Sequence, residues 1–415
     1  MMGTTLEAIK AKYEEAKAKN LNLDMQRGKP GNEQLDLALP MLDLVTSSDY
    51  KNEGDVDPRN YGGLDGTPAM KELFKEFLEV SSVGEVIIGG NSSLNLMHDT
   101  VARAMSHGVV GSEQPWNKLE KVKFLCPSPG YDRHFSVCEH FGIEMVLVDM
   151  TAEGPDCDQI EALVANDASI KGIWVVPKYG NPTGITCSDE VVKRLATMPV
   201  AAGDFRIFWD NAYAVHHLEE EEDQLANILD ACKAAGNEDR VFIYGSTSKI
   251  SFAGAGVAAM GGSKANMDWM RKHLSMATIG PDKLNQLRHL RFFKNMEGVK
   301  AHMKKHAEIL KPKFDTVIEV LENELGGKGL AKWTKPKGGY FISLDTNEGC
   351  AKRVVELANE AGVKLTGAGA TYPYKKDPKD CNIRLAPSCP SVDEIRQAME
   401  VVCLCVAIAD AEKNA

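Results

Sequence analysis

The sequence predicts an α/β protein with a large domain built on a seven-stranded, mostly parallel β-sheet and a second, smaller α/β domain. Two observations point to this fold. From about residue 84, short apolar runs alternate with longer amphipathic stretches, which is the pattern of parallel strands joined by crossover helices. In addition, a chain of 415 residues is long enough for two or three domains with a sizeable core.

Seven apolar runs are the expected strands of the large sheet. In such sheets a ligand binds at the carboxyl ends of the strands, so the residues directly after each run are the first candidates for function. The expected strands are Glu85–Ile88, Val122–Cys126, Glu144–Val148, Gly172–Val176, Ile207–Asp210, Val241–Gly245 and Gly256–Met260.

The second domain is expected beyond a long helical stretch that runs from about Lys264 to Leu325. We therefore expect residues 51–295 to form the large, ligand-binding domain, and residues 1–50 and 296–415 to form the N-terminal arm and the small domain. The expected elements of the small domain are a strand introduced by a glycine turn within Gly338–Leu344, a helix at Ala351–Ala361 and a strand at Asn382–Leu385.

The composition argues against several classes of protein. Lys and Arg number 48 and Asp and Glu 59, and the resulting net charge of −11 disfavours a protein that binds nucleic acid or an anionic membrane. The helix expected within Met1–Lys19 lacks the apolar core of a signal peptide, and the longest apolar run, Val401–Ala409, is too short to cross a membrane. The ten cysteines form no CxxC pair, so we expect reduced, mostly buried thiols in a cytoplasmic protein, without disulfides or a metal site.

Lys249 is the first candidate for chemistry. It follows an expected strand and the turn Gly245–Ser248, at the carboxyl edge of the sheet. Desolvation there would lower the pKa of the ammonium group, and a neutral amine can form a Schiff base with a carbonyl, the linkage that holds pyridoxal phosphate. A phosphate-binding P-loop is the nearest alternative, but its GxxxxGK[ST] spacing is absent because Gly245 lies only four residues before Lys249.

Asp210 is the second candidate because it ends the apolar run Ile207–Trp209, where a carboxylate needs a partner. A protonated pyridine nitrogen is such a partner and lets the cofactor act as an electron sink, whereas an Asp that caps a helix or pairs with an arginine is the more common case. Asn181 and Tyr213 can donate hydrogen bonds to the cofactor's phenolic oxygen. Asn181, which precedes a proline, is also explained as a turn residue.

The segment Gly90–Leu94 is a candidate phosphate site because a glycine turn opens an amphipathic helix there. Free backbone N–H groups and the positive end of the helix dipole suit a phosphate group. An ordinary serine N-cap explains the same residues. Ser246, three residues before Lys249, can add a hydroxyl to the same phosphate.

The order and spacing of these residues resemble the fold type I pyridoxal-phosphate aminotransferases over nearly the whole chain. Three segments are similar to the divergent branch called type Ic aspartate aminotransferases, namely Asn22–Pro30, Tyr61–Gly66 and Thr247–Gly256. The resemblance implies the type I fold, pyridoxal 5'-phosphate as the cofactor and a transamination in two half-reactions.

The resemblance also implies roles for single residues at the cofactor ring. Lys249 would form the internal aldimine and later act as the general base. Asp210 would pair with the pyridine nitrogen, and Asn181 and Tyr213 would hold the phenolic oxygen. Tyr131 would stack on the ring.

Phosphate binding and assembly follow from the same resemblance. Tyr61 would reach the phosphate of the neighbouring subunit, which makes the active unit a homodimer. Most aminotransferases carry an arginine eight residues after the lysine to neutralise the phosphate, but this chain has Val257 there. Lys178, Arg206 and Lys29 are candidates for its replacement. The phosphate ligands within one subunit would be Asn91, Ser92, Ser93 and Ser246.

Arg384 matches the family's arginine that binds the α-carboxylate of the substrate, with Asn181 beside it. A guanidinium fork suits this task because it pairs bidentately with a carboxylate and stays charged. The branch implies dicarboxylic substrates, which need a second cation. Arg27 and Lys29, on either side of Gly28, are the candidates for it.

The expected function is therefore transfer of the amino group of aspartate or glutamate to 2-oxoglutarate or oxaloacetate. An aminotransferase for aromatic or other amino acids and a pyridoxal-phosphate-dependent β-lyase use the same residues, so both alternatives stay open. A non-catalytic sensor that binds the cofactor is disfavoured, because such regulators carry a basic helix-turn-helix domain and only 60 residues precede Tyr61.

Overall fold

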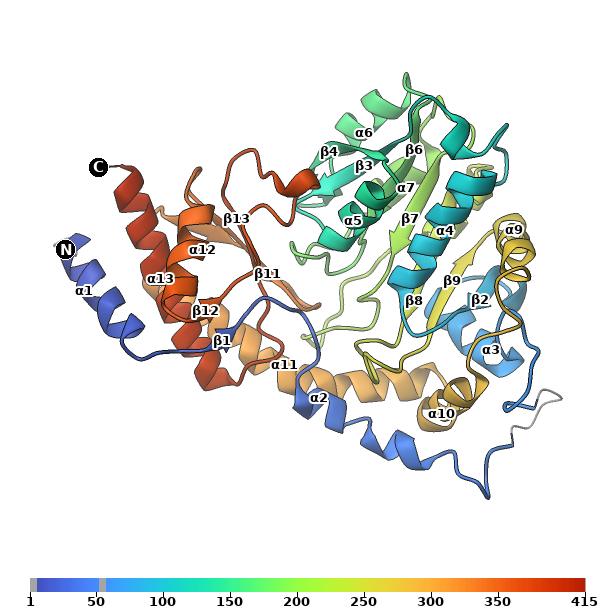
Figure 1. The fold of residues 1–415 in the computed structure, drawn as a ribbon, viewed down its shortest axis with the longest axis horizontal. Helices are drawn as coiled ribbons and strands as arrows, with labels where there is room; N and C mark the ends of the chain where they lie inside the picture. Colours follow the sequence, from blue (N-terminus) through green and yellow to red (C-terminus); the bar gives the residue numbers. More distant parts are fainter. Residues whose placement is uncertain (1–5, 52–56, 415) are drawn as a thin grey trace.

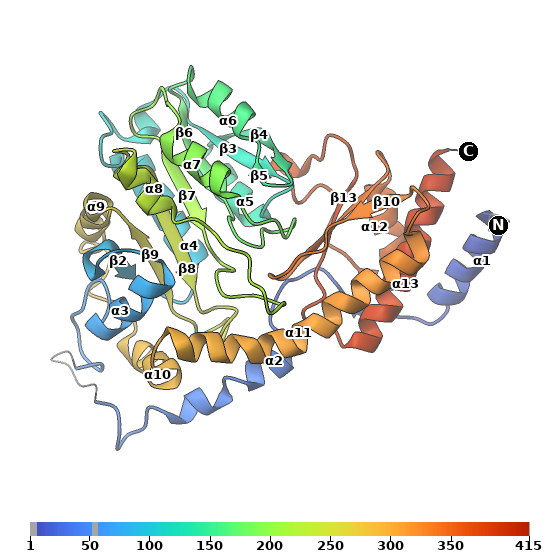
Figure 2. The same ribbon diagram turned by 180° about the vertical axis from the view of Figure 1, so that it is seen from behind.

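The computed structural model describes residues 6–51 and 57–414 of the chain. Figures 1 and 2 show a large twisted sheet between helices at one end of the molecule and a smaller group of strands and helices at the other. The long helix α11 (Met296–Leu325) runs from one group to the other. Both termini lie beside the smaller group.

The large sheet has eight strands in the order β2-β9-β8-β7-β6-β3-β4-β5. Strands β3, β4, β6, β7 and β8 are parallel, and β9 is antiparallel to both of its neighbours. All seven expected strands are present; the eighth, β5 (Gly154–Pro155), has only two residues and therefore no apolar run that could predict it. The other bounds are β2 (Val86–Ile88), β3 (Lys123–Ser128), β4 (Glu144–Thr151), β6 (Ile170–Val175), β7 (Arg206–Asp210), β8 (Val241–Ser246) and β9 (Ala258–Gly262).

The central strands read as continuous apolar runs because both faces of the sheet are buried. Ile207 and Ile243 pack with the helices on one face, whereas their neighbours Phe208 and Phe242 pack with the helices on the other face. The first face is covered by α3 (Pro68–Phe77), α6 (Cys157–Val164), α7 (Asp189–Thr197) and α8 (Ile228–Ala234), and the second by α4 (Ser93–His107), α5 (Asp132–His140) and α9 (Lys264–Leu274).

The helical stretch expected over Lys264–Leu325 consists of three helices: α9, α10 (Lys283–Phe293) and α11. The first break contains Gly280, whose φ is +152° and whose added Cβ would lie 2.6 Å from the carbonyl oxygen of Gly62. The second break is at Lys294, with φ 66°, followed by Asn295, whose side chain caps α11 by accepting from the backbone N–H of Gly298. Apolar periodicity continues across such short breaks, so it could not locate them.

The smaller group is built around a three-stranded antiparallel sheet in the order β10-β11-β13. The N-terminal helix α1 (Leu6–Lys17) packs against the C-terminal helix α13 (Val392–Lys413), and the hydroxyl of Tyr13 donates to the carbonyl oxygen of Leu357 at 2.9 Å. Residues 1–5 of the expected N-terminal helix lie outside the described residues. The remaining bounds are β1 (Leu23–Asp24), α2 (Asn32–Asp36), β10 (Ala331–Trp333), β11 (Ile342–Thr346), α12 (Ala351–Glu360), β12 (Val363–Lys364) and β13 (Asn382–Leu385).

Five short 3-10 helices complete the described elements: η1 (Leu39–Asp43), η2 (Val83–Glu85), η3 (Trp116–Lys118), η4 (Glu238–Arg240) and η5 (Pro373–Lys375). Among the described residues, no helix combines the length and apolar character needed to span a membrane. All ten cysteines are free thiols, and eight of them are buried.

Candidate active site

A cavity opens at the carboxyl edge of the large sheet, where the loops after β2, β3, β6, β7 and β8 meet. Its empty space, including the part open to solvent, is about 610 Å³. Eight of the predicted site residues line it: Ser92, Ser93, Tyr131, Asn181, Asp210, Tyr213, Ser246 and Lys249. The remaining lining residues are Leu94, Met97, Val176, Ala212 and Ser248.

Lys249 projects into this cavity beside two neighbouring tyrosine rings. Its Nζ lies 5.0 Å from the ring centroid of Tyr213 and 5.8 Å from that of Tyr340. Burial lowers the pKa of Lys249, an effect that the negative charge of Asp210 opposes only in part. The surroundings therefore favour the neutral amine, which is the nucleophilic form.

The segment Thr247–Ser251, here called the lysine turn, is hydrogen-bonded to two buried histidines. Nε2 of His289, from α10, lies 2.8 Å from Oγ of Ser251 and 3.1 Å from Oγ1 of Thr247. Nε2 of His302, from α11, lies 2.8 Å from the carbonyl oxygen of Ile250. Burial lowers the pKa of His289 to about 4 and also lowers that of His302, so both rings are neutral near pH 7. The lysine turn is thus fixed to two helices that follow it in the sequence.

Asp210 has one oxygen bound and one free. Its Oδ2 lies 2.9 Å from Nε2 of His134, whose ring stacks on Trp174 with centroids 4.5 Å apart. Its Oδ1 is buried and has no hydrogen-bond partner among the described residues. Because an unpaired buried carboxylate oxygen is costly, Oδ1 fits a ligand that brings a proton-bearing nitrogen into the cavity.

His134 was missed by the sequence analysis, although it orients Asp210. It lies three residues after Tyr131, in the first turn of α5, and a single histidine in an amphipathic helix gives no signal of its own. Its edge-to-face contact with Tyr131, at 5.0 Å between centroids, links it to a second wall of the cavity.

The other end of the cavity is lined by neutral hydroxyl groups. Ser92 is the N-cap residue of α4, yet its side chain makes no capping hydrogen bond. Oγ of Ser246 donates to Oγ of Ser248 at 3.0 Å, and Ser248 donates to the carbonyl oxygen of Asn91, also at 3.0 Å. Asn91 therefore lies directly behind the lining residues. Hydroxyl groups at a helix N-terminus form a donor set that suits a phosphate.

The position of the family's phosphate arginine is occupied by Val257, which is buried and donates its backbone N–H to Oγ1 of Thr247 at 2.9 Å. None of the three proposed substitutes lines the cavity. Arg206 lies at the opposite end of β7 from Asp210, about 13 Å away along the strand, so that hypothesis is wrong. Lys178 is buried with Nζ 3.9 Å from Oε2 of Glu222. Lys29 is exposed on the N-terminal arm.

Arg384 reaches the rim of the cavity from β13. Its Nη1 donates to Oδ1 of Asp132 at 2.8 Å and to Oδ1 of Asn181 at 3.3 Å, and its guanidinium carbon lies 4.9 Å from the ring centroid of Phe341. The arm crosses this ring at Gly28, because a Cβ added there would come within 2.2 Å of Phe341 Cζ. Gly28 thus allows close contact between the arm and the ring under Arg384.

Arg27 and Lys29 flank Gly28 but point into solvent. Both residues are exposed, and neither lines the cavity. The main chain is nevertheless fixed, since Oγ of Ser388 donates to the carbonyl oxygen of Lys29 at 2.8 Å. The structure brings the segment to the correct side of the molecule without bringing a second cation into the cavity.

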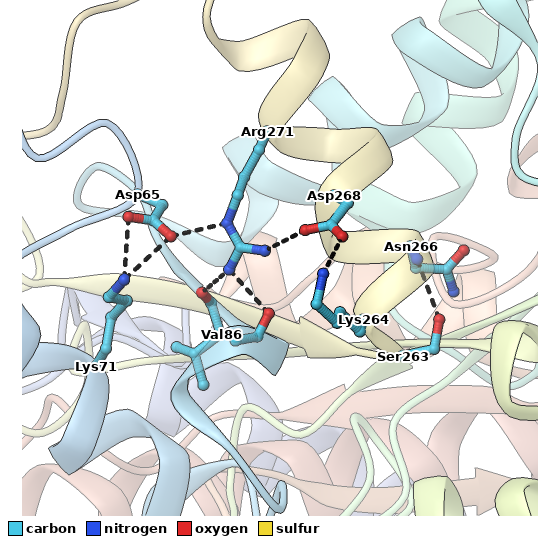
Figure 3. Close-up of polar contacts among 9 residues, drawn as sticks. Asp65, Lys71, Val86, Ser263, Lys264, Asn266, Asp268 and Arg271 are labelled. Carbon is cyan, nitrogen blue, oxygen red and sulfur yellow. Dashed lines mark hydrogen bonds and ion pairs between the residues drawn. The ribbon is translucent and has the colours of Figure 1, made fainter.

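Tyr61 lies outside the cavity of its own chain, with 80% of its surface exposed. Its segment is fixed nonetheless, as Figure 3 shows for Asp65. The Asp65 carboxylate accepts hydrogen bonds from Lys71 Nζ at 3.1 Å and from Arg271 Nε at 2.8 Å, and Arg271 also donates to the carbonyl oxygen of Val86 at 2.9 Å. An exposed tyrosine on an anchored loop is available to a second molecule.

Comparisons with known proteins identify relatives along the entire chain. The sequence model of a family described as aspartate amino-transferase matches residues 2–415. An aspartate aminotransferase from Corynebacterium glutamicum is 50% identical over 414 residues, which cover 100% of this chain and 95% of the relative. The crystal structure of an aspartate transaminase from the same organism superposes with a TM-score of 0.96 at 50% identity, covering 99% of this chain and 96% of that one.

A more distant structure shares the fold. The α-aminoadipate aminotransferase of Thermus thermophilus, solved with N-(5'-phosphopyridoxyl)-L-leucine, has a TM-score of 0.77 at 20% identity and covers 99% of this chain and 98% of its own. The fold extends well beyond the range of close sequence similarity.

Proposed function

Because this chain belongs to the aspartate amino-transferase family and is thereby an aminotransferase of fold type I, we propose that it transfers the amino group of aspartate or glutamate to 2-oxoglutarate or oxaloacetate. The observation that carries this proposal is the placement of the Lys249 amine and the unpartnered Oδ1 of Asp210 in one cavity. The substrate pair is supported by the relative from Corynebacterium glutamicum, which is named an aspartate aminotransferase.

The residues of the cavity fit pyridoxal 5'-phosphate at three points. Oδ1 of Asp210 is suited to accept from a ring nitrogen that bears a proton, burial lowers the pKa of the Lys249 amine and so favours its nucleophilic form, and the hydroxyl groups at the start of α4 suit a phosphate. When bound, this cofactor supplies an electron sink for the negative charge that develops on the substrate's α-carbon. The resemblance to the family assigns the same residues to the same three points.

Lys249 has two tasks in this proposal. Its Nζ holds the cofactor covalently between turnovers and accepts the proton of the substrate's α-carbon once it has been released. Both tasks need the neutral amine, and burial favours this form because it lowers the pKa of Lys249. The rings of Tyr213 and Tyr340 lie on one side of Nζ and limit the access of water from that side.

Asn181 and Tyr213 act as hydrogen-bond donors to the cofactor's phenolic oxygen. Oδ1 of Asn181 already accepts from Arg384, which leaves its amide N–H groups free to donate. Burial raises the pKa of the Tyr213 hydroxyl well above its usual value, so this group keeps its proton and remains a donor. Tyr131 would cover the ring, and Ser92, Ser93, Ser246 and Asn91 would hold the phosphate.

Arg384 binds the α-carboxylate of the substrate in this proposal, because its guanidinium lies at the rim of the cavity next to Asn181. Arg27 or Lys29 would bind the second carboxylate of a dicarboxylic substrate. Neither side chain lines the cavity in this structure, so this role rests on the resemblance to the family.

A homodimer is the proposed assembly, with Tyr61 of one subunit reaching the phosphate of the other. Exposed apolar side chains support this proposal, because a second copy of the chain would cover them. They lie on η1, on α10 and between α9 and α10, and α10 also holds the Tyr61 segment, because its Lys283 donates to the carbonyl oxygen of Gly62 at 2.9 Å. These exposed side chains are Leu39, Leu42, Met276, Ile279 and Leu284.

Two further proposals concern the organisation of the chain and its place in the cell. We propose that residues 51–295 form the cofactor-binding domain and that residues 1–50 and 296–415 form the arm and the small domain, with α11 crossing between them (Figure 2). The free thiols support a cytoplasmic location, since that compartment keeps cysteines reduced.

The test is a panel of amino donors offered with 2-oxoglutarate and ranked by kcat/KM. Aspartate should rank first, and oxaloacetate should accumulate in equal amount to glutamate. An aromatic donor in first place would overturn the substrate assignment. Release of ammonia and pyruvate without an oxo-acid acceptor would instead identify a β-lyase.

A further inference from the structure

Arg384 faces a carboxylate that the proposed function does not use. Oδ1 of Asp132 lies 2.8 Å from Nη1 of Arg384, and the two side chains are 35% and 8% exposed. No other acidic side chain among residues 6–51 and 57–414 forms an ion pair with this arginine. The other contacts are weaker: Nη1 also donates to Oδ1 of Asn181 at 3.3 Å, and Nη2 lies 3.4 Å from Oγ1 of Thr366. Nε has no hydrogen-bond partner in the described part of the chain.

This pair has a clear physical role in the absence of substrate. A guanidinium as buried as that of Arg384 is destabilising without a counter-charge, and Asp132 provides one. The α-carboxylate of an amino acid would bring a second negative charge to the same fork. Two carboxylates on one guanidinium repel each other, so the incoming group competes with Asp132 for the arginine.

Asp132 is also placed so that it can leave the arginine at little cost. It is the first residue of α5, where the positive end of the helix dipole stabilises a carboxylate, and about a third of its side chain already contacts solvent. Arg384, in contrast, is buried on β13 over the ring of Phe341 and is held in place.

We propose that Asp132 is a resident counter-ion of Arg384, which pairs with the arginine in the substrate-free enzyme and moves toward solvent when the carboxylate of a substrate binds. This inference rests on the proposed function. The exchange keeps one carboxylate on Arg384 at every stage, weakens the binding of all carboxylate ligands through competition, and thereby favours product release.

The test measures binding of succinate, a dicarboxylate without an amino group, to the holoenzyme by calorimetry. Asp132→Asn keeps the shape of the side chain and removes its charge, so the Kd for succinate should fall about 10-fold, and the KM for the amino donor should fall with little change in kcat. Asp132→Ser should change the Kd in the same direction. An unchanged or higher Kd in both folded variants would overturn the proposal, because Asp132 would then only orient Arg384.

The chain offers a closely matched control in Asp99→Asn. Asp99 pairs with Nη1 of Arg103 on α4 at 3.2 Å, and the two side chains are 34% and 12% exposed, but neither lines the cavity. Its removal should leave succinate binding unchanged. Arg384→Lys should raise the Kd, and an unaffected Kd would overturn the premise that Arg384 binds carboxylates. Calorimetry reports binding whether or not an amino group is transferred, so a failed donor panel counts against the proposed function alone.

Discussion

Two buried aspartates lie at opposite ends of strand β7 and differ in how many of their carboxylate oxygens are hydrogen-bonded. At the amino edge of the sheet, Asp204 has both oxygens bound: Oδ1 to Lys171 at 2.5 Å, and Oδ2 to Ser112 at 2.7 Å and to Trp116 at 2.9 Å. At the carboxyl edge, Asp210 has one partner and one empty oxygen. The completed set of contacts indicates a structural role, and the incomplete one indicates a ligand site.

The pKa of Asp204 agrees with this distinction. Burial by itself would raise the pKa of this carboxyl group, but the hydrogen bonds from Lys171, Ser112 and Trp116 outweigh that effect, and the net shift is downward. Asp204 is therefore ionised and fully paired within the chain. Oδ1 of Asp210, in contrast, has no hydrogen-bond partner among residues 6–51 and 57–414.

The most severe test of this difference between the two edges is Lys249→Ala. Turnover should fall by about 10⁴-fold or more, because one amine both anchors the cofactor and moves the proton. Borohydride treatment of the wild type should label the peptide that contains Lys249, and the variant should carry no label there. Lys178→Ala is the control, since this amine is also buried with a lowered pKa but lies outside the cavity, and its variant should keep the label.

A second test is Asp210→Asn, which keeps the volume and removes the charge from the carboxyl edge. Activity should fall by about 10² to 10³-fold, since a neutral amide cannot stabilise a protonated ring nitrogen. The melting temperature should stay within a few degrees of the wild type. A folded variant that keeps full activity would contradict the role assigned to Asp210.

Asp204→Asn should have the opposite profile. Loss of this carboxylate leaves Lys171 buried and unpaired, which should lower the free energy of unfolding by about 3 kcal/mol, as measured by urea denaturation. The activity per folded molecule should be unchanged. Asp167→Asn provides a matched control, because the Asp167–Lys123 pair at 2.7 Å is more exposed and its loss should cost below about 1 kcal/mol. An Asp204 variant that is stable but inactive would contradict the structural role assigned to Asp204.

The smallest expected effect is a difference in pH dependence between the two edges. His289, which packs behind the lysine turn, has its pKa lowered from 6.5 to about 4 in the folded protein. As the pH falls, this histidine is therefore protonated in the unfolded chain before it is protonated in the folded one. The stabilisation that neutral His289 provides is present above pH 6.5 and is lost as the pH falls from 6.5 toward 4. The stabilisation that the Asp204 carboxylate provides is lost only when the pH falls below 3.8, the ordinary pKa of this group, because its pKa in the folded protein is lowered.

Thermal melting between pH 7 and pH 4 measures this difference. The wild type should lose stability across that interval, and His289→Gln should give a flatter curve because the titrating ring is gone. If both proteins show the same slope, the loss of stability comes from other groups, and the role assigned to His289 is wrong.

The residues that could be predicted from the sequence share a position in the chain. Lys249, Asp210 and Asn181 each lie shortly after an apolar run or at its end. A strand that is buried on both faces is recognised in the sequence by such a run, because it shows no alternation of apolar and polar residues. The carboxyl ends of parallel strands meet at one edge, so the runs themselves were enough to bring these three together. His134 and Tyr340 were missed because neither directly follows a strand of the large sheet.

The amino-acid sequence alone determined the strands of the large sheet, the lysine with its surrounding residues, and the resemblance to an enzyme family, because all of these are patterns among neighbouring residues. The tertiary structure decided which groups meet across long separations, such as Asp132 with Arg384 and His289 with the lysine turn. It also excluded Arg206 from the phosphate end, since the two ends of a strand are separated by the length of the strand. Partners that lie far apart in the chain are selected by packing, and a local pattern carries no record of that choice.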